Sequence, residues 1–397
     1  MFRAVPRHNI NLTGAELRLV IDGAMGRANS TDGLERFEAK CQRFFGVPHA
    51  LAVESGRTAL HLALHGLGLK PGAVVVLPRY CFFSLIKVVE GMGCTARYAP
   101  IDPNTFALDP NRLEAHLDDA DAVVVIHPFG QIADMSSLQE LCSRRGIPLV
   151  EDASQATGAR WGRLRAGTMS DVGVFSLVSG KNLQTFGGGL LLTQRDDIAR
   201  RIKSRLKPDE QLTPSDAQKA FRSGLQRWLL TTPLGFHGLM HPITRALDLL
   251  APSQLEALTY EERTEYDADR PLRRLSHIQS ELGCLELDEL DRRNSKRRAN
   301  ALRLLERIEG THGLHLPHFN PVSENSFNAV AIRSAWAKEL AHRLRQSGFD
   351  TRTDYMEWFG SEKDFDEEVI YLPNHPAMCS HDIDRLAQAV RTAMHPS

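Results

Sequence analysis

The chain reads IPLVEDASQ at residues 147–155, an apolar run that leads directly into the carboxylate of Asp152. A second apolar run, VGVFS at residues 172–176, leads into a loop that carries Lys181. Short Val- and Leu-rich runs that alternate with helical patterns are typical of a mostly parallel sheet covered by helices on both faces. The sequence therefore predicts an α/β fold, with the ligand site beyond the carboxyl ends of the strands.

Further segments of both kinds extend this pattern along the chain. Apolar runs lie at residues 50–53, 74–77, 122–126 and 190–192, and helical patterns lie at residues 13–50, 58–69 and 136–145.

The C-terminal part predicts a smaller α+β domain. A long helix is expected from about Leu275 to Arg307, with its many Glu, Asp and Arg side chains on outer faces. After it we expect a strand at 328–332, a helix at 337–346 and a last helix capped by Ser380. The predicted division is a large domain at residues 1–270 and a small domain at residues 271–397.

Residues 205–270 interrupt the alternation, since they are rich in Pro, His and Leu and contain no clear strand. The preferred interpretation is a helical excursion packed on the body of the protein or on a second subunit. The alternative is an apolar patch at residues 225–250 that contacts a membrane or takes a lipid-linked substrate.

The composition excludes several functional classes. With 48 basic and 49 acidic residues the net charge is −1, which gives no electrostatic basis for binding nucleic acid or an anionic membrane. The six cysteines are scattered, which argues against a metal site or a disulfide framework and suits a reducing cytosol. No secretory signal or membrane-spanning run is visible. We therefore expect a cytoplasmic protein without a bound metal.

Asp152 and Lys181 carry the strongest chemical signal. Buried carboxylates and lysines are costly unless they are paired or used. Together they match the needs of pyridoxal 5'-phosphate (PLP): the lysine forms a Schiff base, and the carboxylate keeps the pyridine nitrogen protonated. The structural alternatives are a helix-capping Asp152 and a solvated loop lysine. The apolar approach to Lys181 and the glycines at 187–189 disfavour the second.

Two segments suit the cofactor's phosphate. Ser55, Gly56 and Arg57 join a strand to a helix, where free backbone N–H groups favour an anion. The hydroxyl of Ser176 is a further candidate. The alternative for the first segment is an ordinary helix cap, which is the usual role of such a turn.

Two other residues suit the cofactor's ring. Phe82 follows a predicted strand and could stack on a flat ring, although a core aromatic is the alternative. Gln155 lies one turn after Asp152 and could bind a ring oxygen, although a plain polar loop residue is the alternative.

Taken together, these segments resemble the DegT/StrS family of PLP-dependent sugar aminotransferases. The matching segments are residues 36–38, 55–56, 78, 82, 101–103, 127–134 (HPFGQIAD), 151–159 (EDASQATGA), 167–176 and 181–182, with weaker matches at 274–287 and 372–373.

The resemblance implies the fold-type-I architecture and a homodimer with sites at its interface. It implies roles for eight residues: Lys181 as the Schiff-base lysine, Asp152 at the pyridine nitrogen, Phe82 on the ring, Gln155 near the ring oxygen, and Ser55, Gly56, Arg57 and Ser176 around the phosphate.

The chain also departs from the family pattern near the substrate. Residues 185–189 read TFGGG where the family has Thr-Gly-Glu-Gly-Gly, and Val178 replaces a frequent aromatic residue or histidine. Leu272 replaces an asparagine that the family lends to its neighbour's phosphate, so Arg273 and Arg274 become the candidates for that contact. The cofactor half of the site thus matches the family, and the substrate half is altered.

The predicted activity is the transfer of an amino group from an amino acid, with glutamate implied by the family, to a keto-sugar that is linked to a nucleotide. One alternative is an aminotransferase or related PLP enzyme for a more apolar, non-sugar carbonyl compound. Another is a non-catalytic protein that keeps the fold as a sensor or scaffold.

Overall fold

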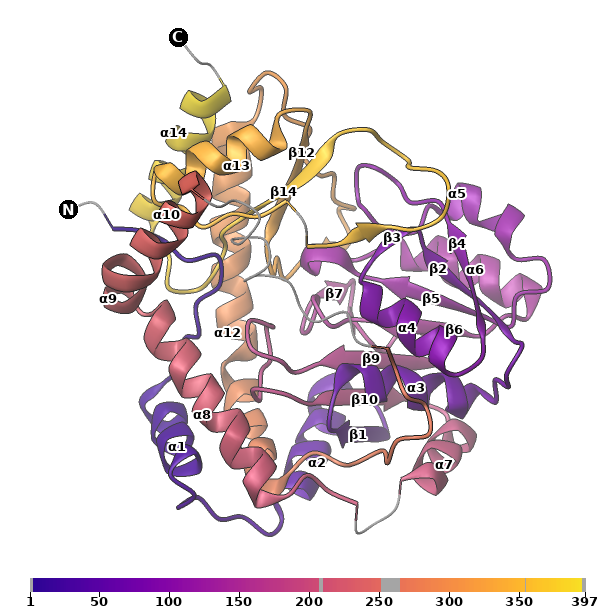
Figure 1. The fold of residues 1–397 in the computed structure, drawn as a ribbon. Helices are drawn as coiled ribbons and strands as arrows, with labels where there is room; N and C mark the ends of the chain where they lie inside the picture. Colours follow the sequence, from indigo (N-terminus) through magenta and orange to yellow (C-terminus); the bar gives the residue numbers. More distant parts are fainter. Residues whose placement is uncertain (1–2, 207–209, 251–264, 354, 395–397) are drawn as a thin grey trace.

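The computed structural model describes residues 3–206, 210–250, 265–353 and 355–394, and a seven-stranded sheet forms its centre (Figure 1). β10 runs antiparallel to both of its neighbours, and the remaining pairs are parallel. The predicted α/β fold with a mostly parallel sheet is confirmed. In spatial order the strands are β1 (His49–Val53), β10 (Gly189–Thr193), β9 (Val172–Ser176), β6 (Leu149–Asp152), β5 (Ala122–Ile126), β2 (Val74–Pro78) and β4 (Thr95–Ala99).

Helices cover both faces of this sheet. Successive strand residues point to opposite faces, so Val123 and Val125 of β5 join one apolar cluster while Val124 and Ile126 join the other. The first face packs against α2 (Gly33–Phe45), α6 (Met135–Arg145) and the first half of α12 (His277–Ile308). The second packs against α3 (Gly56–Leu67), α4 (Phe83–Gly91) and α7 (Asp196–Arg205).

The helix predicted over residues 13–50 is wrong in its extent. The structure has two helices there, α1 (Gly14–Ala24) and α2, followed by strand β1. Gly26 adopts a left-handed conformation, with φ of 69°, which ends the helical path after α1. Ser30, in the segment between α1 and α2, donates a hydrogen bond from its Oγ to Glu281 of α12 at 2.6 Å. This contact holds the segment against a helix that is distant along the chain.

The C-terminal elements form a separate apolar cluster around a two-stranded sheet. This sheet pairs β12 (Val330–Ser334) with β14 (Glu368–Leu372), and α13 (Ala337–Gln346) and α14 (Ser380–Met394) pack on it. The long helix α12 contributes its second half to this cluster, so it spans the molecule (Figure 1). The predicted C-terminal elements are confirmed, and the division at residue 270 stays a prediction.

Several short elements complete the described chain. They are β3 (Tyr80–Cys81) paired with β13 (Glu357–Trp358), the small sheet of β7 (Arg160–Trp161), β8 (Leu164–Arg165) and β11 (Ser323–Glu324), helix α5 (Pro110–Leu113), and the 3-10 turns η1 (Glu114–His116) and η2 (Pro128–Gly130).

Residues 214–250, most of the described part of residues 205–270, are helical, as expected for an excursion from the sheet. α8 (Pro214–Thr231) lies along α1, and the short α9 (Pro233–Gly235) and η3 (Phe236–Met240) lead into α10 (His241–Leu250) (Figure 1). These helices leave large apolar side chains at the surface, Leu234 at 88% exposure among them. Residues 251–264 lie outside the described part. No helix among the described residues is long and apolar enough to cross a membrane.

Candidate active site

The predicted site residues gather at one edge of the sheet. Asp152 ends β6 and Ser176 ends β9, and these strands are parallel neighbours. Gly56 lies against Ser176, because a Cβ added to this glycine would stand 2.9 Å from the Cβ of Ser176. The ends of three strands therefore bring Ser55, Gly56, Asp152 and Ser176 to the same rim, as parallel topology requires.

Asp152 is a buried carboxylate without a cationic partner among the described residues. It is 5% exposed, and its Oδ1 accepts a hydrogen bond from the backbone N–H of Ser154 at 2.9 Å. A carboxylate in such a place is costly unless a positive group is supplied. The arrangement suits a ligand that presents a protonated nitrogen.

Gln155 has one half of its amide engaged. Its Oε1 accepts from the backbone N–H of Phe129 at 3.1 Å, which fixes the orientation of the amide. Its Nε2 is buried and has no hydrogen-bond partner in the described structure. A buried amide donor without an acceptor is unfavourable, so a ligand oxygen at this position would satisfy it.

Lys181 follows Gly180 on a loop that folds back on itself. The N–H of Leu177 donates to the carbonyl of Gly188, and the N–H of Thr185 donates to the carbonyl of Leu177, both at 2.9 Å. The Nζ of Lys181 lies 5.3 Å from the centroid of the Phe82 ring and forms no ion pair within the described chain. Phe82 itself packs edge-to-face on Tyr355 at 4.9 Å.

The start of α3 offers an anion site. Ser55 caps the helix, since its Oγ accepts from the N–H of Thr58 at 3.1 Å, so the capping alternative also holds. The first turn of α3, which includes Arg57, begins at Gly56 beside Ser176, and the first N–H groups of a helix have no acceptor within the helix. A phosphate group would find backbone donors, a hydroxyl and the positive end of the helix dipole there.

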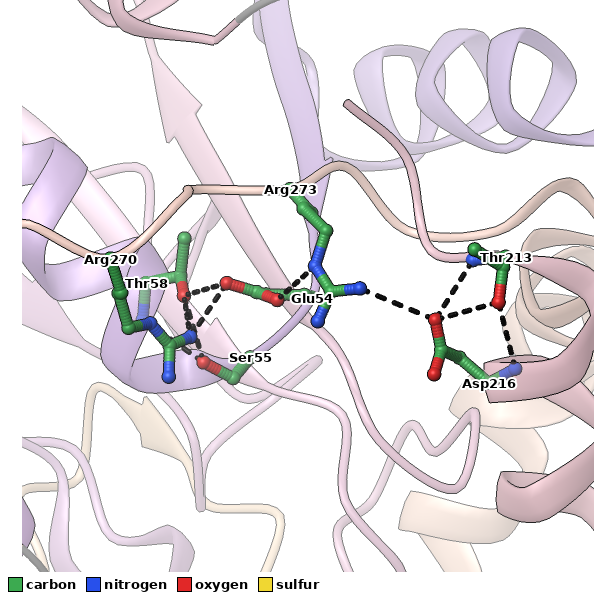
Figure 2. A network of polar contacts seen from close by, with 7 residues as sticks. All are labelled: Glu54, Ser55, Thr58, Thr213, Asp216, Arg270 and Arg273. Atoms are coloured by element: carbon green, nitrogen blue, oxygen red, sulfur yellow. Dashed lines mark hydrogen bonds and ion pairs between the residues drawn. The ribbon is translucent and has the colours of Figure 1, made fainter. Parts of the chain in front are cut away.

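A chain of ion pairs lies beside the first turn of α3 (Figure 2). The nearly buried Glu54 accepts from Arg270 at 2.6 Å and from Arg273 at 3.2 Å, and Arg273 continues to Asp216 of α8 at 3.3 Å. Arg274 pairs with Glu38 of α2. The arginines that we expected to reach a partner's phosphate thus pair with carboxylates of their own chain, and their role toward a partner stays a prediction.

A polar pocket opens on the other side of Lys181. Glu286 and Arg293 of α12, 1% and 3% exposed, form an ion pair at 2.9 Å, and Arg293 also pairs with Glu16 of α1 at 2.6 Å. The expectation that the charges of this helix lie on outer faces is wrong for these residues, because α1 covers them. The pocket is lined by His8, Asn9, Asn11, Gly180, Lys181, Asn182, Gln184, Glu286, Arg293, Arg297, Asn328, Asn374 and His375.

Burial shifts the pKa values of the groups in this pocket. It raises the pKa of Glu286 to about 7, with the opposing pull of Arg293 and a further push from Glu16. It lowers the pKa of Arg297 to about 10 and that of His375 to about 3, the latter helped by Arg297 and Arg3. Burial also lowers the pKa of His8 well below its ordinary value.

The sequence reasoning missed most of this pocket. Its residues come from the N-terminal segment, α12 and the turns near 328 and 374, which are far apart along the chain. One sequence signal could have indicated the pocket. Arg293 and Arg297 lie one helical turn apart with Asn294 between them, so two like charges share one face of the helix. A solvated helix face more often alternates positive and negative charges.

Phe186, the aromatic departure after Lys181, does not enter the pocket lining. It has a left-handed backbone, with φ of 59°, and its buried ring packs against Phe221 and Gly224 of α8. The loop after Lys181 and the helical excursion therefore pack against each other, because α8 supplies the surface that the ring of Phe186 contacts. No group of three or more His, Cys, Asp or Glu side chains that could hold a metal occurs among the described residues.

Comparison with known proteins gives consistent matches. The model of the DegT/DnrJ/EryC1/StrS aminotransferase family matches residues 17–265 and 271–391. The dTDP-3-amino-3,4,6-trideoxy-alpha-D-glucose transaminase of Streptomyces venezuelae is 29% identical over 361 residues, 88% of this chain and 82% of that protein. GDP-perosamine synthase of Caulobacter vibrioides is 35% identical over 168 residues, 42% of this chain and 45% of that protein.

The solved structures agree. The crystal structure of S. venezuelae DesV in complex with a ketimine intermediate has a TM-score of 0.74 at 26% identity, and the match covers 99% of this chain and 100% of that one. This likeness confirms the predicted aminotransferase fold.

Proposed function

Because the chain belongs to the DegT/DnrJ/EryC1/StrS aminotransferase family, we propose that it is a PLP-dependent enzyme that moves an amino group from an amino acid, glutamate in the first instance, to a nucleotide-linked keto-sugar. The similarity to a dTDP-sugar transaminase and to GDP-perosamine synthase supports the sugar acceptor. The observation that carries the proposal is the buried carboxylate of Asp152, which has no cationic partner among the described residues and lies at the same rim as the start of α3.

The residues of the rim fit PLP. In this proposal Asp152 holds the proton on the pyridine nitrogen, and the unused amide donor of Gln155 binds the ring oxygen. Phe82 stacks on the ring, and the first turn of α3 with Ser55, Gly56, Arg57 and Ser176 holds the phosphate.

When bound, PLP supplies the aldehyde that takes up the amino group and a ring that accepts electrons from the substrate carbon. Lys181 would hold the cofactor through its Nζ, and the same amine, when free, would move the proton at the substrate carbon. We further propose that the protein is cytoplasmic and forms a homodimer. Light scattering of the purified protein tests the homodimer.

The apolar-carbonyl alternative has less support. It rested on Phe186, Val178 and the apolar segment 225–250. The ring of Phe186 packs on α8, and the pocket beside Lys181 is lined by polar and charged side chains. The sensor alternative makes a separate prediction, which is bound PLP that exchanges with no amino donor.

The test follows the absorption spectrum of the PLP-loaded protein. Glutamate is expected to convert the cofactor to its amine form, and borohydride before glutamate is expected to fix the cofactor on Lys181 alone. Lys181→Ala should abolish both results, whereas Lys203→Ala, a change at an exposed lysine of α7, should leave both intact. Cofactor fixed at another residue, or at none, overturns the proposal.

A further inference from the structure

Arg293 and Arg297 lie one turn apart on α12, yet their charges are balanced differently. Arg293 contacts two buried carboxylates, Glu16 at 2.6 Å and Glu286 at 2.9 Å. Arg297 has no carboxylate within 4.0 Å among the described residues. A buried cation is unfavourable without an anion, so Arg297 is the unbalanced member of the pair.

The guanidinium of Arg297 has donors to spare. The residue is 7% exposed, and its side chain makes one hydrogen bond, from Nη1 to the Oδ1 of Asn294 at 3.2 Å. A guanidinium has five N–H donors in a planar fork that matches a carboxylate. Arg297 lines the same pocket as Lys181.

Two amide oxygens of the same pocket lack donors. The Nδ2 of Asn328 donates to the carbonyl of Gly180 and to Asn182, both at 3.0 Å, and this fixes the direction of its Oδ1. The Nδ2 of Asn374 is likewise engaged, by the carbonyls of Arg297 and Phe327. The Oδ1 atoms of Asn328 and Asn374 are buried without a hydrogen-bond partner in the described structure.

The charge of the pocket favours an anion. Two carboxylates, Glu16 and Glu286, stand against the two arginines Arg293 and Arg297, so the four charges cancel only when both carboxyl groups are ionised. Burial raises the pKa of Glu286 to about 7, which leaves the cluster with net positive charge near neutral pH.

We propose that the pocket between Lys181 and Arg297 is a carboxylate subsite, in which Arg297 binds a carboxylate of one substrate while the free amide oxygens of Asn328 and Asn374 accept from its hydroxyl or ammonium groups. The proposal rests on the proposed function and names the substrate class of that site. The carboxylate belongs either to the amino donor or to a keto-sugar that carries an acid group, and the experiment distinguishes these sources.

Binding of glutarate to the PLP-loaded protein, measured by calorimetry, tests the subsite without turnover, so the result does not depend on aminotransferase activity. Arg297→Gln and Arg297→Met are expected to weaken glutarate binding at least about tenfold. Arg298→Gln, a change at the neighbouring and more exposed arginine, should alter it less than about twofold. Equal affinity in the wild type and both Arg297 variants, or no glutarate binding by the wild type, overturns the proposal.

Both variants are expected to fold, because removing Arg297 leaves no carboxylate without its partner; thermal unfolding checks this. The half-reaction with glutamate then assigns the source. If the carboxylate is the donor's, Arg297→Gln raises the half-saturating glutamate concentration about tenfold with a similar limiting rate. If it is the acceptor's, the glutamate half-reaction is unchanged, and the variant loses its preference for keto-sugars with an acid group over neutral ones.

Discussion

The two sides of Lys181 are built in different ways. On the rim side, Asp152 and Ser176 end neighbouring strands, and Asp152 accepts a hydrogen bond from the backbone N–H of Ser154, two residues further along the chain. On the pocket side, Arg293 and Glu286 are buried in an ion-pair cluster with Glu16 of another helix. Strand geometry therefore holds the first side, and tertiary packing of charges holds the second. Substitutions on the rim should therefore change the chemistry, and substitutions in the ion-pair cluster of Glu16, Glu286 and Arg293 should change stability.

The largest effect on rate is expected for Asp152→Asn. The asparagine keeps an oxygen for the N–H of Ser154 but loses the charge that would hold a protonated ring nitrogen. We expect the rate of the glutamate half-reaction to fall by about 10²–10³-fold with little change in the free energy of unfolding. Stopped-flow absorbance and urea denaturation measure the two quantities. A large loss of stability with an unchanged rate would break the contrast between the two sides.

The largest effect on stability is expected for Arg293→Met. It leaves Glu16 and Glu286 buried together without their cation, which should cost about 3–5 kcal/mol of unfolding free energy. The matched control is Arg292→Met on the exposed side of α12, where the ion pair with Glu289 contributes less than about 1 kcal/mol. Urea denaturation of both variants gives the comparison, and equal losses would mean that the buried cluster is not what stabilises this side.

Glu286→Gln should sharpen the comparison through pH. The pKa of Glu286 is raised from 4.5 to about 7, so the folded state binds this proton more tightly than the unfolded state. Relative to the Gln variant, the wild type therefore has its full stability below about pH 4.5 and loses up to about 3 kcal/mol as pH rises through 7.

Urea denaturation of both proteins from pH 4 to 8 measures this difference. Burial lowers the pKa values of His8, His61 and His375, and these histidines act with the opposite sign below about pH 6.5. They are present in both proteins, so their contribution cancels when the two curves are subtracted. A difference that stays flat across this range would contradict the raised pKa.

The two sides also differ in how far the sequence predicts them. Asp152 and Ser55 follow apolar runs, and the rule that ligand sites lie beyond strand ends was enough to place them on one rim. No such local rule reaches the pocket, since Glu16 and Arg293 stand 277 positions apart along the chain. From sequence alone, a helix rich in charged residues is expected to face solvent, and here only the structure shows that α1 covers the charged residues of α12.

The same reasoning explains the error at residues 13–50. The apolar spacing there fits one helix, and the break between α1 and α2 depends on Gly26 and on the contact of Ser30 with Glu281, a residue of α12. The excursion at α8 was predicted only as helical. Its packing against Phe186 could not be predicted, because it depends on the left-handed backbone conformation of that residue, which only the structure shows.

One consequence follows from the close approach of Gly56 to Ser176. In the sheet, β10 lies between β1, the strand that precedes Gly56, and β9, the strand that ends at Ser176, and β10 begins at Gly189. A Cβ at Gly189 would collide with the carbonyl oxygen of Ser55, and a Cβ at Gly56 would crowd Ser176. Neither position leaves room for a side chain. An alanine at either one is expected to push the start of α3 away from the strand ends beside it, and so to separate the two segments that are proposed to hold one phosphate.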